Sequence, residues 1–170
     1  MLILGLDPGS LHTGYGLVEK AERSGASFRV VDAGRFSGPR ALALPARLAR
    51  LAAGLQDLLD RYPPDLAVLE SPFHGMNAHS LIVLAQARGA LLAALAGRGI
   101  EIREYTPAEV KSAVTGNGRA GKEQVARMVR LILGVAGGGW PSDATDALAV
   151  ALCCGQRLRL DRLREQAPAR

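Results

Sequence analysis

Apolar runs bounded by glycine and proline predict five strands in this chain. Runs of this kind are typical of buried strands, and the glycine and proline residues between them indicate turns. The predicted strands are LILGLD at 2–7, GYGLVE at 14–19, FRVVDAGRF at 28–36, LAVLE at 66–70 and GIEIREY at 99–105. We interpret the first three as consecutive antiparallel strands.

Leucines at helical spacing, with arginines on the opposite side, predict an amphipathic helix at 44–62 that Pro63 and Pro64 terminate. Further helices are predicted at 77–97, after Pro107, at 122–134 and from 141 onward. The helix at 77–97 is apolar on most faces, so we expect one side to meet a second copy of the chain. These elements predict an α/β fold with a five-stranded mixed sheet flanked by helices.

The composition fits one soluble domain, because 170 residues of which 48% are hydrophobic can bury a sizeable core. We assign residues 1–156 to this domain and residues 157–170 to a basic C-terminal tail, for which disorder is one interpretation. The longest apolar run is interrupted by Gln86, Arg88 and Gly89, so no membrane partner is expected.

The expected location is cytoplasmic. The chain opens on MLILGLDPG, which lacks the basic segment of a signal peptide. Cys153 and Cys154 are adjacent, a spacing that rarely satisfies disulfide geometry, and they indicate small core residues in a reducing compartment.

The charge balance permits a nucleic-acid partner. The net charge is +5, and 18 of the 21 basic residues are arginines, which leaves lysine only at positions 20, 111 and 122. Lysine offers a compact and mobile charge that the guanidinium group does not imitate. The rarity of lysine therefore makes its few positions candidates for specific roles.

Two of the predicted strands end in an acidic residue. Asp7 closes the strand at 2–7 and Glu70 closes the strand at 66–70, and a proline-containing break follows each acid. Both strands are apolar and are linked through a helix, so we expect them to be parallel neighbours. Their carboxyl ends then carry both carboxylates to the edge of the sheet where α/β proteins build their sites.

Two further acids, Asp143 and Asp146, lie at the start of the last predicted helix. One interpretation is structural, because acids in a first turn interact favourably with the helix dipole. The alternative is that the helix brings four carboxylates together at the strand ends. Like charges 4 Å apart repel by about 4 kcal/mol at an effective dielectric constant of 20. Such a cluster suits Mg²⁺ or Mn²⁺, and two ions about 4 Å apart commonly serve phosphodiester hydrolysis.

Five segments of the sequence resemble the RuvC family of Holliday-junction resolvases, within the RNase H-like superfamily. The segments are GLDPGSLHTGYG, LESPFHGMN, LAQARG, VKSAVTGNGRAGKEQV and SDATDALAVAL. They follow one another in the family's order and spacing from residue 2 to about residue 155. Ala85 stands where the family usually has glycine. Some relatives have histidine where Asp143 stands, and the aspartate here keeps the site all-carboxylate.

The resemblance implies an RNase H-like fold and a homodimeric crossover (Holliday) junction endodeoxyribonuclease of DNA recombination and repair. It implies two Mg²⁺ or Mn²⁺ ions per active site, four-way junction DNA as substrate, and paired symmetric nicks with 5′-phosphate and 3′-hydroxyl ends. It also implies a partner, the RuvA-RuvB branch-migration complex. Carried over residue by residue, the catalytic metal ligands are Asp7, Glu70, Asp143 and Asp146, and the DNA-binding residues are Phe73, Asn77, Lys111 and Lys122, the last also catalytic.

Lys122 also has a competing interpretation, because GNGRAGKE at 116–123 is close to a nucleotide-binding phosphate loop. Glu123 stands where that motif needs a metal-binding hydroxyl, and a predicted helix precedes it where the motif needs a strand. We therefore interpret Lys122 as a cation near a DNA phosphate, with ordinary solvated surface as the alternative.

Phe73 lies in a loop beside Glu70, where stacking on an unpaired base and folding back onto the apolar helix are both open. His74 and His79 lack a third ligand nearby, so zinc is not expected.

Two other functional classes stay open. A non-catalytic protein selective for branched DNA would bind its target without divalent metal, and the complete acidic set argues against it. A phosphotransferase of the related actin-like fold is suggested by LDPGSLHTGYG alone. A chain of 170 residues lacks the second lobe with which such enzymes clamp a nucleotide.

Overall fold

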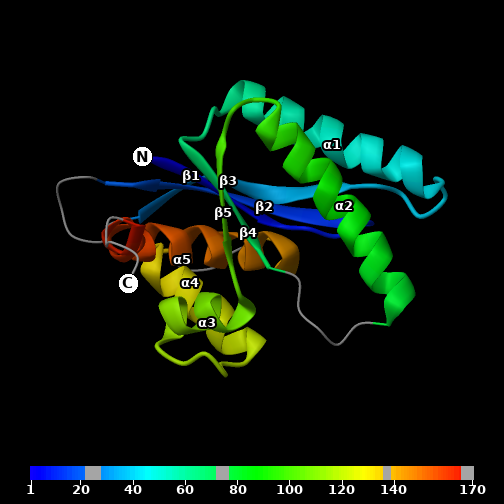
Figure 1. Ribbon diagram of the computed structural model, residues 1–170. Helices are drawn as coiled ribbons and strands as arrows, with labels where there is room; N and C mark the ends of the chain where they lie inside the picture. Colours follow the sequence, from blue (N-terminus) through cyan, green and yellow to red (C-terminus); the bar gives the residue numbers. More distant parts are fainter. Residues whose placement is uncertain (22–27, 72–76, 136–138, 166–170) are drawn as a thin grey trace.

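The five predicted strands form one mixed sheet in the computed structural model (Figure 1). The structure describes residues 1–21, 28–71, 77–135 and 139–165, with side chains as far as residue 158. The strands are β1 (Leu2–Asp7), β2 (His12–Lys20), β3 (Phe28–Ser37), β4 (Leu66–Glu70) and β5 (Glu101–Tyr105). Their order in the sheet is β3-β2-β1-β4-β5.

The pairing of the strands agrees with the expectation from the sequence. β1, β2 and β3 are consecutive and antiparallel, β4 runs parallel to β1, and β5 runs parallel to β4. The predicted fold class, a five-stranded mixed sheet flanked by helices, is therefore confirmed, as is the parallel pairing of the two strands that end in acids.

Helices cover both faces of the sheet. They are α1 (Leu44–Arg61), α2 (Ala78–Ala96), α3 (Pro107–Thr115), α4 (Lys122–Ile132) and α5 (Ser142–Glu165). One face packs against α1 and α2, and the other packs against α5 with α3 and α4 beyond it (Figure 1). Leu4 and Leu6 of β1 pack in the core on the α1 and α2 side of the sheet, and Ile3 packs in the core on the α5 side. This double burial explains why β1 is an unbroken apolar run.

Glycines in the sheet allow α5 to lie directly on β1 and β2. A Cβ atom on Gly5 would overlap the main-chain oxygen of Ala147, and one on Gly14 would overlap that of Asp143. Gly14 is the residue of β2 that pairs with Asp7 of β1. The close approach therefore sets the first turn of α5 beside the carboxyl end of β1.

Two predicted boundaries are corrected by glycines that end helices. The fifth strand begins at Glu101 rather than at residue 99, because Gly99 has a φ of 66° and the Ile100 amide bonds back to the Leu95 carbonyl at 3.3 Å. The helix predicted at 122–134 ends at Ile132, and Gly134 follows it with a φ of 65°.

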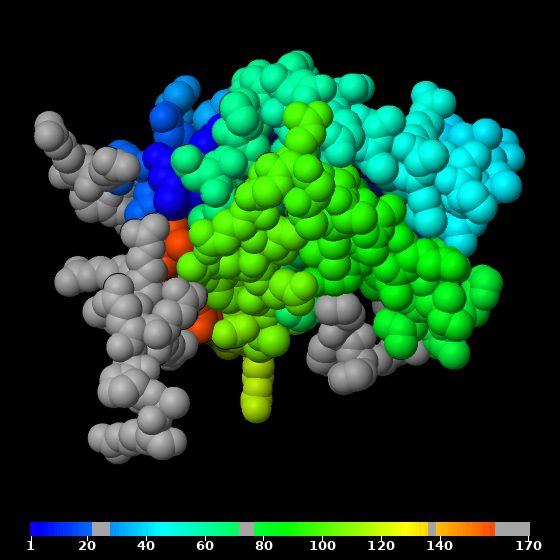
Figure 2. Space-filling model, turned by 45° about the horizontal axis from the view of Figure 1, so that its top comes forward, coloured from blue at the N-terminus to red at the C-terminus, as the bar shows by residue number. Residues whose placement is uncertain are grey.

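α2 carries an exposed apolar surface at its amino-terminal half. Leu91 and Leu95 are fully buried against the sheet, whereas Ile82 is 59% exposed. Figure 2 shows the outer side of α2 (green) uncovered beside α1 (cyan). By length and composition alone α2 could cross a membrane, a test that helices of soluble proteins also pass.

α5 continues across the predicted domain boundary at residue 156. Arg157 forms an ion pair with Glu109 of α3 at 3.0 Å and lies over the ring of Tyr105, and Leu158 is buried. Residues 166–170 lie outside the described residues. A basic tail therefore stays a prediction, and its first two residues pack on the domain.

Candidate active site

β1 and β4 bring Asp7 and Glu70 to the same edge of the sheet. Leu6 of β1 is in register with Leu69 of β4, so the next residue of each strand is one of these two acids. Pro8 then turns the chain away from β1. The strand pattern seen in the sequence thus places two carboxylates next to each other.

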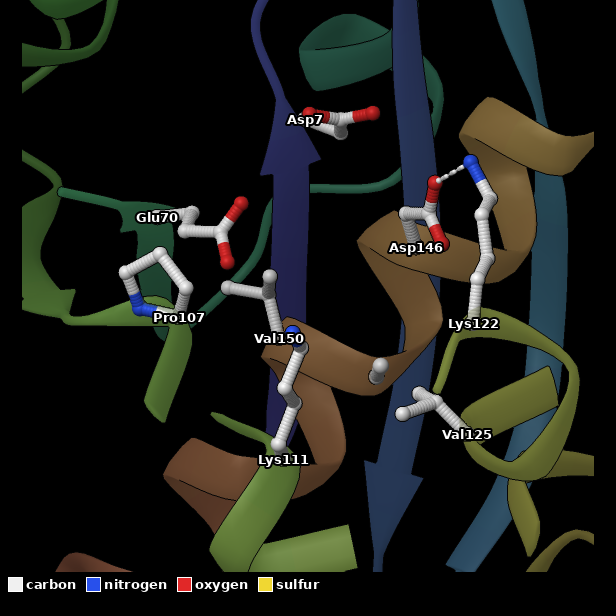
Figure 3. Close-up of a pocket in the computed structure, with 9 residues that line it drawn as sticks. Asp7, Glu70, Pro107, Lys111, Lys122, Val125, Asp146 and Val150 are labelled. Atoms are coloured by element: carbon white, nitrogen blue, oxygen red, sulfur yellow. Dashed lines mark ion pairs between the residues drawn. The ribbon is translucent and has the colours of Figure 1, made fainter. Parts of the chain in front are cut away.

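α5 adds Asp146 to these carboxylates, and the three acids line one cavity of about 390 Å³ (Figure 3). Lys111 of α3 and Lys122 of α4 enter the same cavity. Its apolar wall is formed by Pro107, Val125, Ala149 and Val150. Five of the predicted site residues, from five different elements, are therefore brought together.

Burial and crowding favour the neutral form of the strand-end acids. Burial raises the pKa of the Asp7 carboxyl from an ordinary 3.8 to about 7, and the charges of Asp146, Glu70 and Asp143 act in the same direction. Burial also raises the pKa of Glu70, with a further contribution from Asp146. Lys122 opposes both changes and Lys111 opposes the change at Glu70, but neither lysine cancels them. Both carboxyl groups are therefore easier to protonate than a carboxyl group in water.

The two lysines reach the cavity from helices whose starts are well fixed. Thr106 and Glu109 form a capping box at the start of α3, the helix that carries Lys111. Lys122 is the first residue of α4, and its ammonium group lies 2.7 Å from an Asp146 carboxylate oxygen. The hydrogen bond to Asp146 raises the pKa of Lys122.

Asp143 lies at the margin of this site. Its carboxylate is 3.8 Å from a guanidinium nitrogen of Arg35 on β3 and accepts a hydrogen bond from the Ser142 hydroxyl at 3.3 Å. Asp143 does not line the cavity, but its charge contributes to the raised pKa of Asp7. The four acids predicted from the sequence thus share one electrostatic environment.

The two remaining predicted DNA-binding residues are Phe73 and Asn77. Phe73 lies outside the described residues. Asn77 is the N-cap of α2, where its side-chain oxygen accepts a hydrogen bond from the Ser80 amide at 2.9 Å. A role of Asn77 in DNA binding stays a prediction beside this capping role.

The donor atoms of the site fit hard divalent cations. Among the described residues, no three acidic, histidine or cysteine side chains are close enough to surround one ion as they stand. Asp146 is instead held by Lys122. The available donors are carboxylate oxygens without thiolate or imidazole, which suits Mg²⁺ or Mn²⁺. Bound cations would also offset the burial and the repulsion that together raise the pKa of Asp7.

Sequence reasoning missed three residues that shape the site. Gly14 permits the close approach of α5, Arg35 pairs with Asp143, and Arg88 of α2 donates a hydrogen bond to the main-chain oxygen of Glu70 at 2.7 Å. The glycines in two adjacent strands were a signal for close helix packing. Arg88 lies in the LAQARG segment of the resemblance, but neither it nor Arg35 indicated its partner, because the partners are distant in sequence.

The sequence matches one known protein family along most of its length. The model of the family described as crossover junction endodeoxyribonuclease RuvC matches residues 3–154. The proteins of that name from Chloroflexus aggregans and Anaeromyxobacter dehalogenans are 45% and 48% identical over 153 residues. These alignments cover 90% of this chain and 92% and 80% of the two relatives.

Solved structures of Thermus thermophilus RuvC share the fold. One has a TM-score of 0.87 at 32% identity and covers 95% of this chain and 97% of its own. Another, in complex with a Holliday junction substrate, has a TM-score of 0.85 at 29% identity, with coverage of 94% and 96%. The yeast mitochondrial resolvase Ydc2 shares the fold with a TM-score of 0.68 at 13% identity, covering 96% of this chain and 81% of its own. The RNase H-like fold is thereby confirmed, and the chain belongs to the RuvC family of crossover junction endodeoxyribonucleases.

Proposed function

We propose that this protein hydrolyses phosphodiester bonds of four-way (Holliday) DNA junctions and introduces paired symmetric nicks. The observation that carries the proposal is the single cavity that joins Asp7, Glu70 and Asp146 with Lys111 and Lys122. Family membership supports the choice of substrate, because a relative of high structural similarity was solved with a Holliday junction.

The acids hold the divalent ions in this proposal. Two Mg²⁺ or Mn²⁺ ions would be bound by Asp7, Glu70, Asp143 and Asp146. The first two and Asp146 supply carboxylate oxygens to the cavity, and Asp143 adds negative charge at its margin. When bound, such ions lower the pKa of an attacking water and stabilise charge on the leaving oxygen. The resulting ends carry 5′-phosphate and 3′-hydroxyl groups.

The lysines serve the DNA strand rather than the metal. Lys122 is held by Asp146 in the free protein, and the side chain is 66% exposed. An incoming phosphate can therefore reach the ammonium group, and the ion pair with Asp146 is exchanged for one with the strand. Lys111 enters the same cavity from α3, beside Val150 (Figure 3). The two lysines neutralise a phosphate beside the carboxylates.

Two symmetric nicks require two active sites, which we propose a homodimer supplies through α2. The exposed Ile82 and the apolar residues around it lie on an outer face without a described partner. We expect Ile82→Glu to convert a dimer into a monomer in light scattering. Leu131→Glu is the matched control, because Leu131 is 70% exposed on a different helix. Monomeric parent protein would contradict this part of the proposal.

The setting of the activity follows from its substrate. We propose that the protein acts in the cytoplasm, together with the RuvA-RuvB branch-migration complex. Support for a reducing compartment comes from Cys153 and Cys154, which are buried in the core and whose adjacent positions rarely satisfy disulfide geometry.

A labelled synthetic four-way junction and a linear duplex of the same sequence test the proposal. With Mg²⁺ we expect nicks at symmetric positions in two opposite strands of the junction and none in the duplex. EDTA or Asp7→Asn should abolish the nicks. Junction binding without cleavage in either Mg²⁺ or Mn²⁺ would contradict the enzymatic proposal and favour a structure-selective DNA-binding protein.

A further inference from the structure

A buried arginine connects α2 to the strand that carries Glu70. Arg88 is only 7% exposed. One of its terminal nitrogens donates a hydrogen bond to the Glu70 carbonyl at 2.7 Å, and the other lies 2.6 Å from a Glu104 carboxylate oxygen on β5. The second contact is an ion pair without the geometry of a hydrogen bond. Arg88 thus bridges the carboxyl ends of two neighbouring strands.

Glu70 needs this support because it lies beyond the paired part of its strand on one side. The pairing of β4 with β1 ends at Leu69 and Leu6, and β1 then turns away at Pro8. On the other side, Glu70 is in register with Tyr105 of β5. Arg88 donates its hydrogen bond to the Glu70 carbonyl just beyond the last residue of β4 that pairs with β1.

Packing alone does not explain an arginine at this place. A buried guanidinium group loses its hydration, and apolar residues of similar volume often replace buried ion pairs without loss of stability. The neighbouring core residues of α2, Leu91 and Leu95, are apolar and fully buried. The fork of the guanidinium group does what an apolar side chain cannot, because it holds two strand ends with two separate nitrogens.

We propose that Arg88 is a positioning residue that fixes the Glu70 carboxylate for metal binding. The inference rests on the proposed function, because it takes Glu70 as a metal ligand. Arg88 touches neither the metal nor the DNA. Its hydrogen bond restricts the main chain of Glu70, and this restriction limits where the Glu70 carboxylate can lie. Loss of such an outer partner typically weakens metal affinity 10- to 100-fold.

The test is the affinity for Mn²⁺ alone, measured by electron paramagnetic resonance of free Mn²⁺ without DNA. We expect Arg88→Met to raise the half-saturating Mn²⁺ concentration at least 10-fold. Arg88→Lys keeps the charge but offers a single ammonium group, so an intermediate increase is expected. Arg98→Met is the matched control, since Arg98 follows α2 and pairs with Asp60 on the surface. It should bind Mn²⁺ like the parent.

Junction affinity in EDTA separates positioning from general damage. We expect Arg88→Met to bind the junction within about twofold of the parent, while the Mg²⁺ concentration for half-maximal cleavage rises at least 10-fold. Unchanged Mn²⁺ affinity in a folded Arg88→Met protein would overturn the inference, and so would failure of both Arg88 variants to fold. A parent protein that binds Mn²⁺ but cuts no junction would instead contradict the proposed function.

Discussion

Burial of Asp7 beside other acids makes the metal-free protein less stable as the pH rises. The pKa of Asp7 is about 7 in the folded protein against an ordinary 3.8, so the folded state binds the proton more tightly than the unfolded state. The contribution of Asp7 to the free energy of unfolding is then greatest below pH 3.8 and decreases as the pH rises to 7. The full difference corresponds to about 4 kcal/mol, and solvent in the open cavity reduces it to about 2–4 kcal/mol.

Asp7→Asn isolates this effect, because asparagine resembles the protonated acid in shape and carries no charge. We expect parent and variant to have nearly equal unfolding free energies at about pH 3.5, below the ordinary pKa of the Asp7 carboxyl. At pH 8 in EDTA the variant should be more stable by about 2–4 kcal/mol. Urea unfolding followed by circular dichroism measures both values. Asp57→Asn, an exposed position on α1, is the control and should change stability by less than about 0.5 kcal/mol at either pH.

Divalent metal should narrow the difference in stability between the two proteins. A ligand that binds only the folded state adds about 2.7 kcal/mol at 100 times its dissociation constant. We expect Mg²⁺ to stabilise the parent at pH 8 and to stabilise Asp7→Asn much less. The reasoning is refuted if the variant is less stable than the parent in EDTA at pH 8, or if the difference between them does not change with pH.

Three further predictions concern the lysine, the glycines and the product. Lys122→Ala should slow cleavage about 100-fold and change junction affinity less than threefold in gel-shift assays, whereas Arg127→Ala, on the same helix outside the cavity, should do neither. Gly14→Ala should cost about 1–3 kcal/mol in urea unfolding, because its Cβ overlaps α5, whereas Gly89→Ala, with open space around it, should be neutral or stabilising. DNA ligase should reseal the nicks directly, and nicks that need end repair first would contradict the proposed ends.

The strand-end acids were accessible to sequence reasoning because the relevant signals are local. An apolar run of five or six residues that ends in an acid and a proline-containing break describes both β1 and β4. The parallel pairing then followed from the helical connection between them. α1 was likewise predictable, since its leucines recur on one face and two prolines stop it.

The contacts that complete the site depend on residues far apart in the chain. Lys122 meets Asp146 because α4 and α5 pack together, and Arg88 reaches Glu70 because α2 packs on one face of the sheet. The spacing of residues along the chain does not predict these contacts. Each partner can also be interpreted as an ordinary surface or helix residue. Asp143 illustrates the same ambiguity, because it is both a first-turn acid and a contributor to the charge at Asp7.

A supercoiled plasmid that extrudes a cruciform tests the central claim most directly. A cruciform is a four-way junction in closed circular DNA, so paired nicks within one binding event give linear product, whereas single nicks give open circles. We predict Mg²⁺-dependent linear product from this plasmid and none from a matched plasmid without the inverted repeat. Equal nicking of both plasmids, or no cleavage of either, would contradict the account.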